Sequence, residues 1–176
     1  MTEPLLSIRD LSIVYKVGRA DVMAVDRASF DVAPGEIVGL VGESGCGKTT
    51  LARALTRVLA DNARIAGGQA VFAGRDLVAL PERQMNALRW RDIAFIPQSA
   101  MNSLDPVYTV GAQIMEVLTA RGGMGRAAVR ARAVELFDWV GIETGRLGDY
   151  PHQFSGGMRQ RVAIALALAL NPKLVI

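Results

Sequence analysis

The stretch of sequence that decides the fold is Gly42-Glu43-Ser44-Gly45-Cys46-Gly47-Lys48-Thr49, which matches the pattern G-x-x-x-x-G-K-[ST]. Residues 36–41 before it are apolar enough to predict a buried strand, and residues 50–59 after it predict a helix. A glycine-rich turn between a strand and a helix lets successive backbone N–H groups converge on one anion. The context therefore predicts a polyphosphate-binding loop rather than an ordinary turn.

Within this loop, called the P-loop below (residues 42–49), two side chains have predicted roles. Lys48 is expected to reach the β- and γ-phosphates of a nucleotide, and the hydroxyl of Thr49 is expected to ligate Mg²⁺. A dinucleotide site would need the spacing G-x-G-x-x-G, which this loop does not have. The sequence therefore predicts a nucleotide site with Mg²⁺.

A second motif is Tyr150-Pro151-His152-Gln153-Phe154-Ser155-Gly156-Gly157-Met158-Arg159-Gln160-Arg161. Ser155 is a good helix N-cap, and the two glycines after it let the backbone approach a ligand. A capped helix start is common and would mean little by itself. Together with the P-loop, this segment resembles the signature motif of ATP-binding cassette (ABC) ATPases, whose usual core is L-S-G-G-Q. The resemblance implies that it closes over the γ-phosphate held by the P-loop of a partner chain.

The same resemblance assigns three further residues. Gln98 ends a short apolar strand and resembles the Q-loop glutamine, which approaches Mg²⁺ and the attacking water. Tyr15 lies ahead of the P-loop and resembles the aromatic residue that stacks on adenine, although a strand-end aromatic is more often part of a core. His152 precedes the signature, so it is interpreted as a loop histidine packed beside that motif rather than as the switch histidine.

The run of residues 98–111, together with the sequence motif around Ser155, resembles the ATPase subunits of bacterial dipeptide, oligopeptide and nickel importers. Met158 departs from the consensus glutamine of the wider family. The resemblance implies ATP and Mg²⁺ as cofactors, a second ABC ATPase subunit in a homo- or heterodimer, transmembrane permease subunits as partners, and a peripheral location on the cytoplasmic face of the membrane. The alternatives are a soluble ABC ATPase of DNA repair or translation, or a nucleotide-binding module without hydrolysis.

The candidate site residues follow from the two motifs and the resemblance. Gln98 is the candidate catalytic residue, and Thr49 and Gln98 are the candidate metal contacts. The candidate nucleotide contacts are Tyr15, Gly42, Glu43, Ser44, Gly45, Cys46, Gly47, Lys48, Thr49, Thr50, Ser155, Gly156 and Gly157.

The last residues predict an apolar helix over 158–170, a stop at Asn171-Pro172 and a buried strand that begins at Leu174. In ABC ATPases this strand leads into the aspartate that holds Mg²⁺ and the glutamate that polarises water. Neither follows within the sequence, which ends at Ile176. The chain is therefore interpreted as a C-terminally truncated ABC ATPase, an ATP hydrolase when complete but inactive as residues 1–176 alone.

Composition agrees with this interpretation. The longest apolar run spans nine residues, 162–170, whereas a membrane span needs about 20. The N-terminus has no basic and apolar segments typical of a signal peptide. A net charge of +3 does not argue for nucleic acid, and Cys46 as the single cysteine excludes an intrachain disulfide. Arg126, Arg130 and Arg132 are expected to form the solvated face of a helix.

The predicted fold class is α/β: a P-loop NTPase core with an antiparallel β subdomain and an inserted helical subdomain, lacking the last part of the core. Residues 1–97 are expected to form the nucleotide-binding core, 98–161 the helical subdomain with the signature, and 162–176 a return to the core. The expected strands cover 6–8 and 11–13, with a phase slip at Arg9-Asp10, then 28–32, 69–73 and 93–98. A turn at Pro34-Gly35 and helices at 110–118 and 126–140 complete the pattern.

Overall fold

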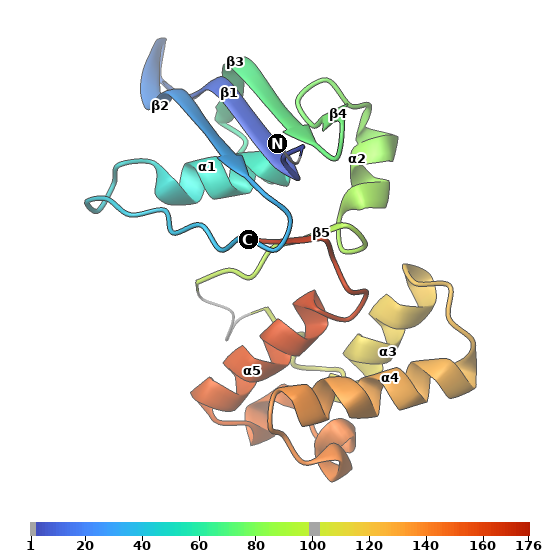
Figure 1. Cartoon of the computed structure of the whole chain (residues 1–176). Helices are drawn as coiled ribbons and strands as arrows, with labels where there is room; N and C mark the ends of the chain where they lie inside the picture. Colours follow the sequence, from blue (N-terminus) through green and yellow to red (C-terminus); the bar gives the residue numbers. More distant parts are fainter. Residues whose placement is uncertain (1–2, 99–102) are drawn as a thin grey trace. The chain divides into compact units, whose positions relative to one another are not determined.

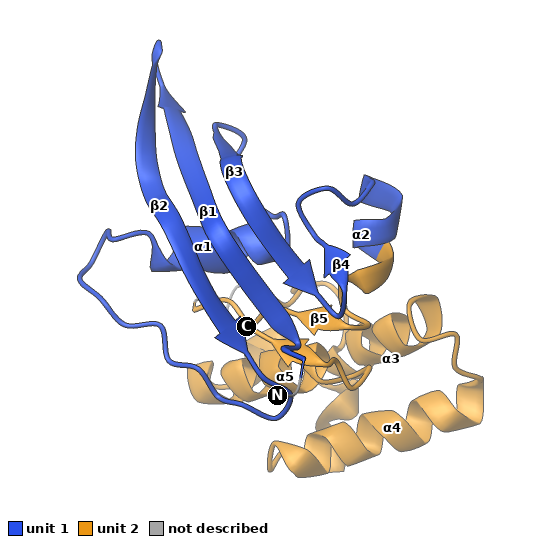
Figure 2. Cartoon of the chain, turned by 45° about the horizontal axis from the view of Figure 1, so that its top comes forward, with its two compact units in different colours: residues 1–86 blue, residues 87–176 orange. Residues whose placement is uncertain are grey.

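The computed structural model describes residues 3–98 and 103–176. Residues 99–102, which belong to the run 98–111 that resembles importer ATPases, lie outside the described residues. The chain forms two compact units, residues 1–86 and 87–176 (Figure 2). The first unit is built around an antiparallel sheet, and the second is mostly helical (Figure 1). This confirms the predicted α/β class with an antiparallel sheet, while the finer division at residues 97 and 161 stays a prediction.

The first unit contains a four-stranded antiparallel sheet in the order β2-β1-β3-β4. Its strands are β1 (Leu6–Val17), β2 (Ala20–Val32), β3 (Ala63–Phe72) and β4 (Arg75–Asp76). Leu6 and Ile8 in β1 are buried, and so are Leu11 and Ile13, which have the opposite parity. The register shifts between Ile8 and Leu11, where Asp10 takes a left-handed φ of 48°. The predicted phase slip is therefore a β-bulge, which returns the apolar side chains to the same face.

Opposite this bulge, Gly68 in β3 has φ +87°, and a Cβ at this position would lie 2.3 Å from the carbonyl oxygen of Asp10. Gly68→Ala is therefore expected to lower the free energy of unfolding by about 2 kcal/mol or more, since backbone strain and a backbone clash add together. Gly74→Ala is the matched control, because Gly74 has φ +76° but open space around its Cβ position. Urea denaturation of both variants measures the difference, and equal losses would contradict the proposed clash.

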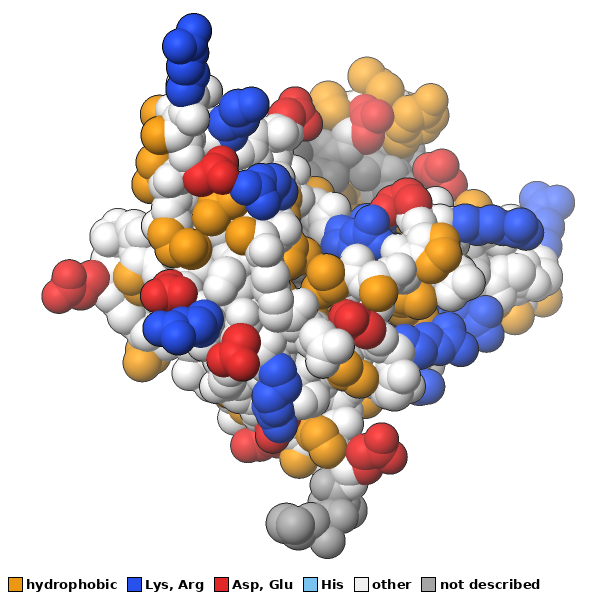
Figure 3. Space-filling model, turned by 90° about the horizontal axis from the view of Figure 1, so that it is seen from above, with side chains coloured by type: hydrophobic (Ala, Val, Ile, Leu, Met, Phe, Trp, Pro, Cys, Tyr) orange, Lys and Arg blue, Asp and Glu red, His pale blue; other side chains and the backbone are white. Residues whose placement is uncertain are grey.

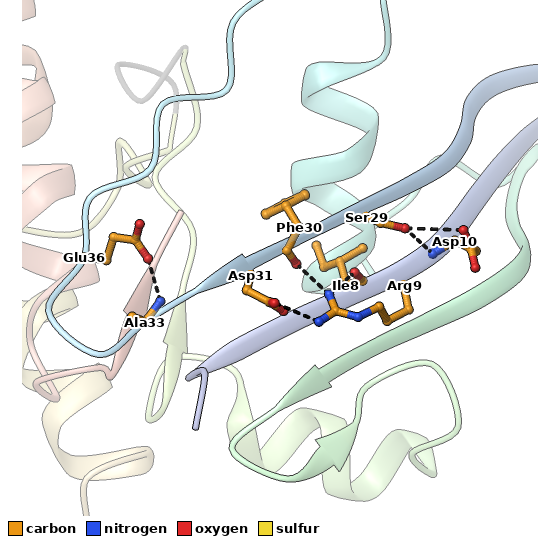
Figure 4. Close-up of polar contacts among 8 residues, drawn as sticks. All are labelled: Ile8, Arg9, Asp10, Ser29, Phe30, Asp31, Ala33 and Glu36. Atoms are coloured by element: carbon orange, nitrogen blue, oxygen red, sulfur yellow. Dashed lines mark hydrogen bonds and ion pairs between the residues drawn. The ribbon is translucent and has the colours of Figure 1, made fainter. Parts of the chain in front are cut away.

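A polar network ties β1 to β2 along the exposed face of the sheet (Figure 4). Arg9 donates from Nη2 to Asp31 Oδ2 at 2.7 Å, and the backbone N–H of Asp10 donates to Ser29 Oγ at 2.8 Å. The hydrogen bond from Arg9, with a second from Ser7, lowers the pKa of Asp31 below its ordinary value of 3.8. Because the pKa of Asp31 is lowered in the folded state, its hydrogen bond with Arg9 stabilises the fold fully above the unfolded pKa. This stabilisation is lost as the pH falls through the lower pKa of the folded state.

Helix α1 (Lys48–Leu55) contacts β1 and β2 and buries Leu51, Ala54 and Leu55. The prediction of a helix over 50–59 is thus confirmed, but the helix ends earlier, at Leu55. Arg57 takes a left-handed φ of 52°, and the N–H of Val58 bonds to the carbonyl of Arg53 at 3.0 Å. These are the features of a Schellman motif, which ends a helix by satisfying its last carbonyls.

The prediction of a buried strand at residues 36–41 is wrong. The structure assigns no strand there, and Ile37 and Val41 are 98% and 89% exposed. A strand needs a hydrogen-bonded neighbour, and the described strands pair only within the β2-β1-β3-β4 sheet and the β5-β6 pair. The predicted turn before this segment does form: the N–H of Glu36 bonds to the carbonyl of Ala33 at 3.2 Å, and its carboxylate accepts from Ala33 N at 2.7 Å (Figure 4).

The second unit contains helices α3 (Val110–Ala120), α4 (Arg126–Trp139) and α5 (Gly156–Ala167), and the short 3₁₀ helices η2 (Thr144–Gly148) and η3 (Pro151–Gln153). Helix α2 (Glu82–Leu88) spans the division between the units. Strand β5 (Ile93–Ala94) pairs in parallel with β6 (Leu174–Val175), which confirms that a strand begins at Leu174. The three helices enclose one apolar core formed by Leu104, Val110, Ile114, Leu118, Val129, Ala133, Leu136, Phe137, Ile142, Phe154, Val162, Ala165, Leu166 and Ala169.

Arg132 differs from its predicted place on a solvated helix face. Its side chain is only 10% exposed, and it donates to the carbonyls of Leu168 and Ala169 and to Asn171 Oδ1, at 3.1, 3.2 and 2.6 Å. These acceptors lie at the C-terminal end of α5, where helix carbonyls lack intrahelical partners and attract a cation. Arg126 and Arg130 are exposed, as predicted.

Within the two described ranges, the structure has no helix that is both long and apolar enough to cross a membrane.

Candidate nucleotide-binding site

The P-loop leads into the N-terminus of α1 in the first unit. The N-cap residue is Gly47, with φ 93°, and no side chain caps the helix. Gly45 also has a left-handed φ, of 82°. A Cβ at Gly47 would lie 2.3 Å from the carbonyl oxygen of Ala24 in β2. Glycine is therefore required at this position. Within the described residues no side chain caps α1, so its first N–H groups can donate to an external acceptor.

Lys48 is held by the loop that it belongs to. Its ammonium donates to the carbonyl oxygens of Gly42 and Glu43 at 2.8 and 2.6 Å, and it lies 3.4 Å from Cys46 Sγ. Cys46 is exposed, and its sulfur would lie 2.7 Å from a Cβ at Gly42. The positive charge of Lys48 thus sits within the P-loop itself, next to the uncapped start of α1.

A cavity of about 330 Å³ opens beside the P-loop. The hydroxyls of Tyr15 and Thr50 share a hydrogen bond of 3.1 Å at this site, so the structure brings the candidate aromatic residue to the P-loop. The lining residues come from β1, β2, the P-loop and α1, and they are Tyr15, Val22, Met23, Ala24, Gly45, Gly47, Lys48, Thr49 and Thr50.

Sequence reasoning missed Val22, Met23 and Ala24. The signal that identifies them is the β1–β2 register, which places Tyr15 opposite Val22 across the hairpin. Because β2 begins at Ala20, well before the predicted strand at 28–32, the apolar residues of its first half reach the cavity. Val22 and Met23 are half exposed, at 50% and 54%, and so present apolar surface at the site.

The residues present fit a nucleotide with a bound divalent cation. An aromatic ring and two apolar side chains suit a base, whereas the Lys48 ammonium and an uncapped helix N-terminus suit phosphates. Among the described residues, no three His, Cys, Asp or Glu side chains gather in a way that could hold a metal. Mg²⁺ usually takes few protein ligands and keeps phosphates and waters, so the Thr49 hydroxyl at the cavity can serve as one of its protein contacts.

The signature residues lie at the start of α5, in the second unit. Ser155 is the N-cap, and its hydroxyl accepts a hydrogen bond from Met158 N at 3.3 Å, as predicted. Ser155 and Gly157 are exposed, and a Cβ at Gly157 would meet open space. The ring of His152 stacks on that of Tyr150, with centroids 5.8 Å apart. His152 lies directly before the signature residues, in η3 rather than in a loop as interpreted from the sequence.

Gln98 also lies in the second unit and is exposed, but it does not end a strand as predicted, because β5 stops at Ala94. The candidate residues are thereby divided: Tyr15 and the P-loop belong to residues 1–86, and Gln98 and the signature belong to residues 87–176. The assignment of roles to these residues stays a prediction.

Comparison with curated proteins finds transporter ATPases. OppD of Salmonella typhimurium, an oligopeptide transport ATP-binding protein, is 47% identical over 98% of this chain, which covers 52% of OppD. DppD of Escherichia coli, a dipeptide transport ATP-binding protein, is 42% identical over 98% of this chain, which covers 53% of DppD. YejF of Agrobacterium fabrum, a peptidoglycan transport ATP-binding protein, is 47% identical over 99% of this chain, which covers 33% of YejF. The chain thus spans a third to about a half of the length of these relatives.

Solved structures agree with the sequence relatives. The dimeric structure of MJ0796, described as a bacterial ABC transporter cassette, matches with a TM-score of 0.85 at 27% identity and covers 97% of this chain and 72% of that one. A dimeric post-hydrolysis state of the same cassette, bound to ADP and Pi, matches with a TM-score of 0.84. The family model described as "ABC transporter" matches residues 25–176. The chain therefore belongs to the ABC transporter family of ATP-binding cassette proteins.

Proposed function

We propose that this chain is the ATP-binding part of an ABC importer subunit, which couples ATP binding and hydrolysis to the import of peptides or nickel. The observation that carries the proposal is the cavity at the P-loop, which combines Tyr15, Lys48, Thr49 and the uncapped start of α1. Relatives named for oligopeptide, dipeptide and peptidoglycan transport favour a peptide as the solute.

In this proposal each group of residues has one task. The Tyr15 ring stacks on the adenine base, while the P-loop amides and Lys48 hold the phosphates. Thr49 contacts Mg²⁺, which when bound neutralises charge on the phosphates. Gln98 positions the attacking water, and Ser155, Gly156 and Gly157 donate to the γ-phosphate of a nucleotide held by a partner subunit.

The proposed partners are a second ABC ATPase subunit and transmembrane permease subunits at the cytoplasmic face of the membrane. The dimeric structures of the MJ0796 cassette support the first of these, and the transporter names of the sequence relatives support the second. A soluble ABC ATPase of DNA repair or translation is one alternative. On the face drawn in Figure 3, lysine and arginine side chains are interspersed with acidic ones, which does not favour a phosphate backbone as partner. Co-purification with permease subunits distinguishes the two functions.

Lys48→Ala tests the proposed ATP site. We expect ATP affinity to fall by roughly tenfold to a hundredfold, because charge-assisted hydrogen bonds to phosphate contribute about 1.5–3 kcal/mol. Calorimetric titration with Mg²⁺ and ATP measures the loss. Arg53→Ala is the matched control, since it removes a positive charge from an exposed position of α1 that does not line the cavity. Unchanged ATP affinity in Lys48→Ala, or an equal loss of ATP affinity in both variants, would contradict the assignment of Lys48 as a phosphate contact.

A further inference from the structure

We propose that Arg146 is a positioning residue, which holds the signature segment (residues 150–158) in the geometry needed to receive the γ-phosphate of a partner subunit. The inference rests on the proposed function, since it concerns the same contact between the signature residues and the γ-phosphate held by a partner subunit. Arg146 belongs to η2 and lies outside both sequence motifs.

The guanidinium of Arg146 contacts the chain on both sides of the signature glycines. Nη2 donates to the carbonyl oxygen of Gln153 at 2.9 Å, and the guanidinium carbon lies 4.5 Å from the centroid of the Phe154 ring. Nη1 lies 3.4 Å from the sulfur of Met158, in the first turn of α5. One planar group thus connects the residues immediately before Ser155 with the residue immediately after Gly157.

A counter-ion fixes Arg146 in turn. Nε donates to Asp149 Oδ2 at 2.8 Å, and both side chains are less than a third exposed, which shields the ion pair from screening. The backbone carbonyl of Asp149 accepts from Val110 N, the first residue of α3, at 2.9 Å. Asp149 therefore connects Arg146, through its side chain, to the start of α3, through its backbone.

The segment needs such bracing because of its own composition. Two consecutive glycines, Gly156 and Gly157, restrict the backbone very little, and Gly157 is exposed with open space beside it. Hydrogen-bond donors favour a developing or bound charge most when they are already fixed in place, and a displacement of about 1 Å can cost a hundredfold in rate. Phe154 is 3% exposed and anchored in the core, so Arg146 stacked on it is well placed to fix the donors that follow.

Met158 provides the weakest of the contacts that Arg146 makes with the signature segment. Where the wider family has glutamine, this chain presents a thioether, which is a weak acceptor toward Arg146 Nη1. The stronger contacts of Arg146 are therefore those to Asp149, Gln153 and Phe154. Lysine cannot reproduce them, because it lacks the planar fork that bonds in several directions and stacks on a ring.

Arg146→Gln in the full-length protein tests the proposal, with Arg130→Gln as the matched control at an exposed position of α4. We expect each chain to bind ATP with unchanged affinity by calorimetry, because the P-loop belongs to the other unit. ATP-dependent dimerisation, measured by analytical ultracentrifugation, should weaken by roughly tenfold to a hundredfold. In steady-state kinetics kcat should fall while KM for ATP stays the same. Arg130→Gln should match the wild type in all three measurements.

Arg146→Lys keeps the inference testable if the glutamine variant unfolds. It retains the charge beside Asp149 but not the fork, so dimerisation should again weaken, by about tenfold, without loss of the folded state. A purely structural role would lower the melting temperature and leave the dimerisation of the folded protein unchanged. Wild-type dimerisation in both Arg146 variants overturns the inference. Failure of the proposed function appears elsewhere, as a wild-type protein that neither binds ATP nor dimerises with it.

Discussion

Gly156→Asp is expected to abolish ATP-dependent dimerisation of the full-length protein while each P-loop still binds ATP. The substitution places a carboxylate at the first residue of α5, where the partner's γ-phosphate is proposed to bind. Two like unit charges about 4 Å apart repel by about 4 kcal/mol at an effective dielectric constant of about 20, roughly a thousandfold in the association constant. Folding should not suffer, since an acidic residue in the first turn favours a helix.

Gly156→Asn is the matched control, because asparagine has almost the same shape as aspartate without its charge. Light scattering with Mg²⁺ and ATP measures dimerisation of both variants. If the aspartate variant dimerises like the wild type, the signature does not face a phosphate. If the asparagine variant fails equally, the loss is steric and the charge argument is wrong.

The second large effect concerns hydrolysis. A polypeptide of residues 1–176 is expected to bind ATP without measurable turnover. Its proposed metal and water contacts, Thr49 and Gln98, are neutral side chains. The ABC resemblance places the Mg²⁺-binding aspartate and the water-polarising glutamate after the strand that begins at Leu174, and residues 174–176 include neither. General-base assistance alone contributes about 10²–10⁴ in rate.

A phosphate-release assay on residues 1–176 measures this directly. A polypeptide extended past Ile176 is the comparison, and we expect it to gain Mg²⁺-dependent activity that Lys48→Ala removes. Robust turnover by residues 1–176 themselves, lost in Lys48→Ala, would show that other residues carry the chemistry.

Local patterns predicted the parts of the fold that are set by neighbouring residues. The helices at 110–118 and 126–140 appear as α3 and α4, and Ser155 caps α5 as its sequence context indicated. The phase slip at Arg9-Asp10 became the β-bulge, because burial on one face requires the apolar side chains to return to it. Each of these features depends on residues a few positions apart.

The errors arose where partners distant in sequence decide the outcome. Residues 36–41 have the composition of a buried strand, but pairing depends on neighbours that composition does not reveal. The place of Arg132 depends on the C-terminal end of α5, 36 to 39 residues further along the chain. Val22 and Met23 reach the candidate site only through the register of the β1–β2 hairpin. The sequence around Arg146, a single arginine between the two motifs, does not indicate its contacts with Asp149 and Gln153, which only the structure shows.

The measurement that tests the central claim most directly is hydrogen exchange of the backbone amides with and without Mg²⁺ and ATP. If the P-loop holds the phosphates, amides in residues 42–50 should exchange more slowly when ATP is present, because they become hydrogen-bond donors to it. Lys48→Ala should remove most of this protection at the same ATP concentration, whereas Arg53→Ala should not. Unchanged exchange over residues 42–50 at a saturating ATP concentration would contradict the account.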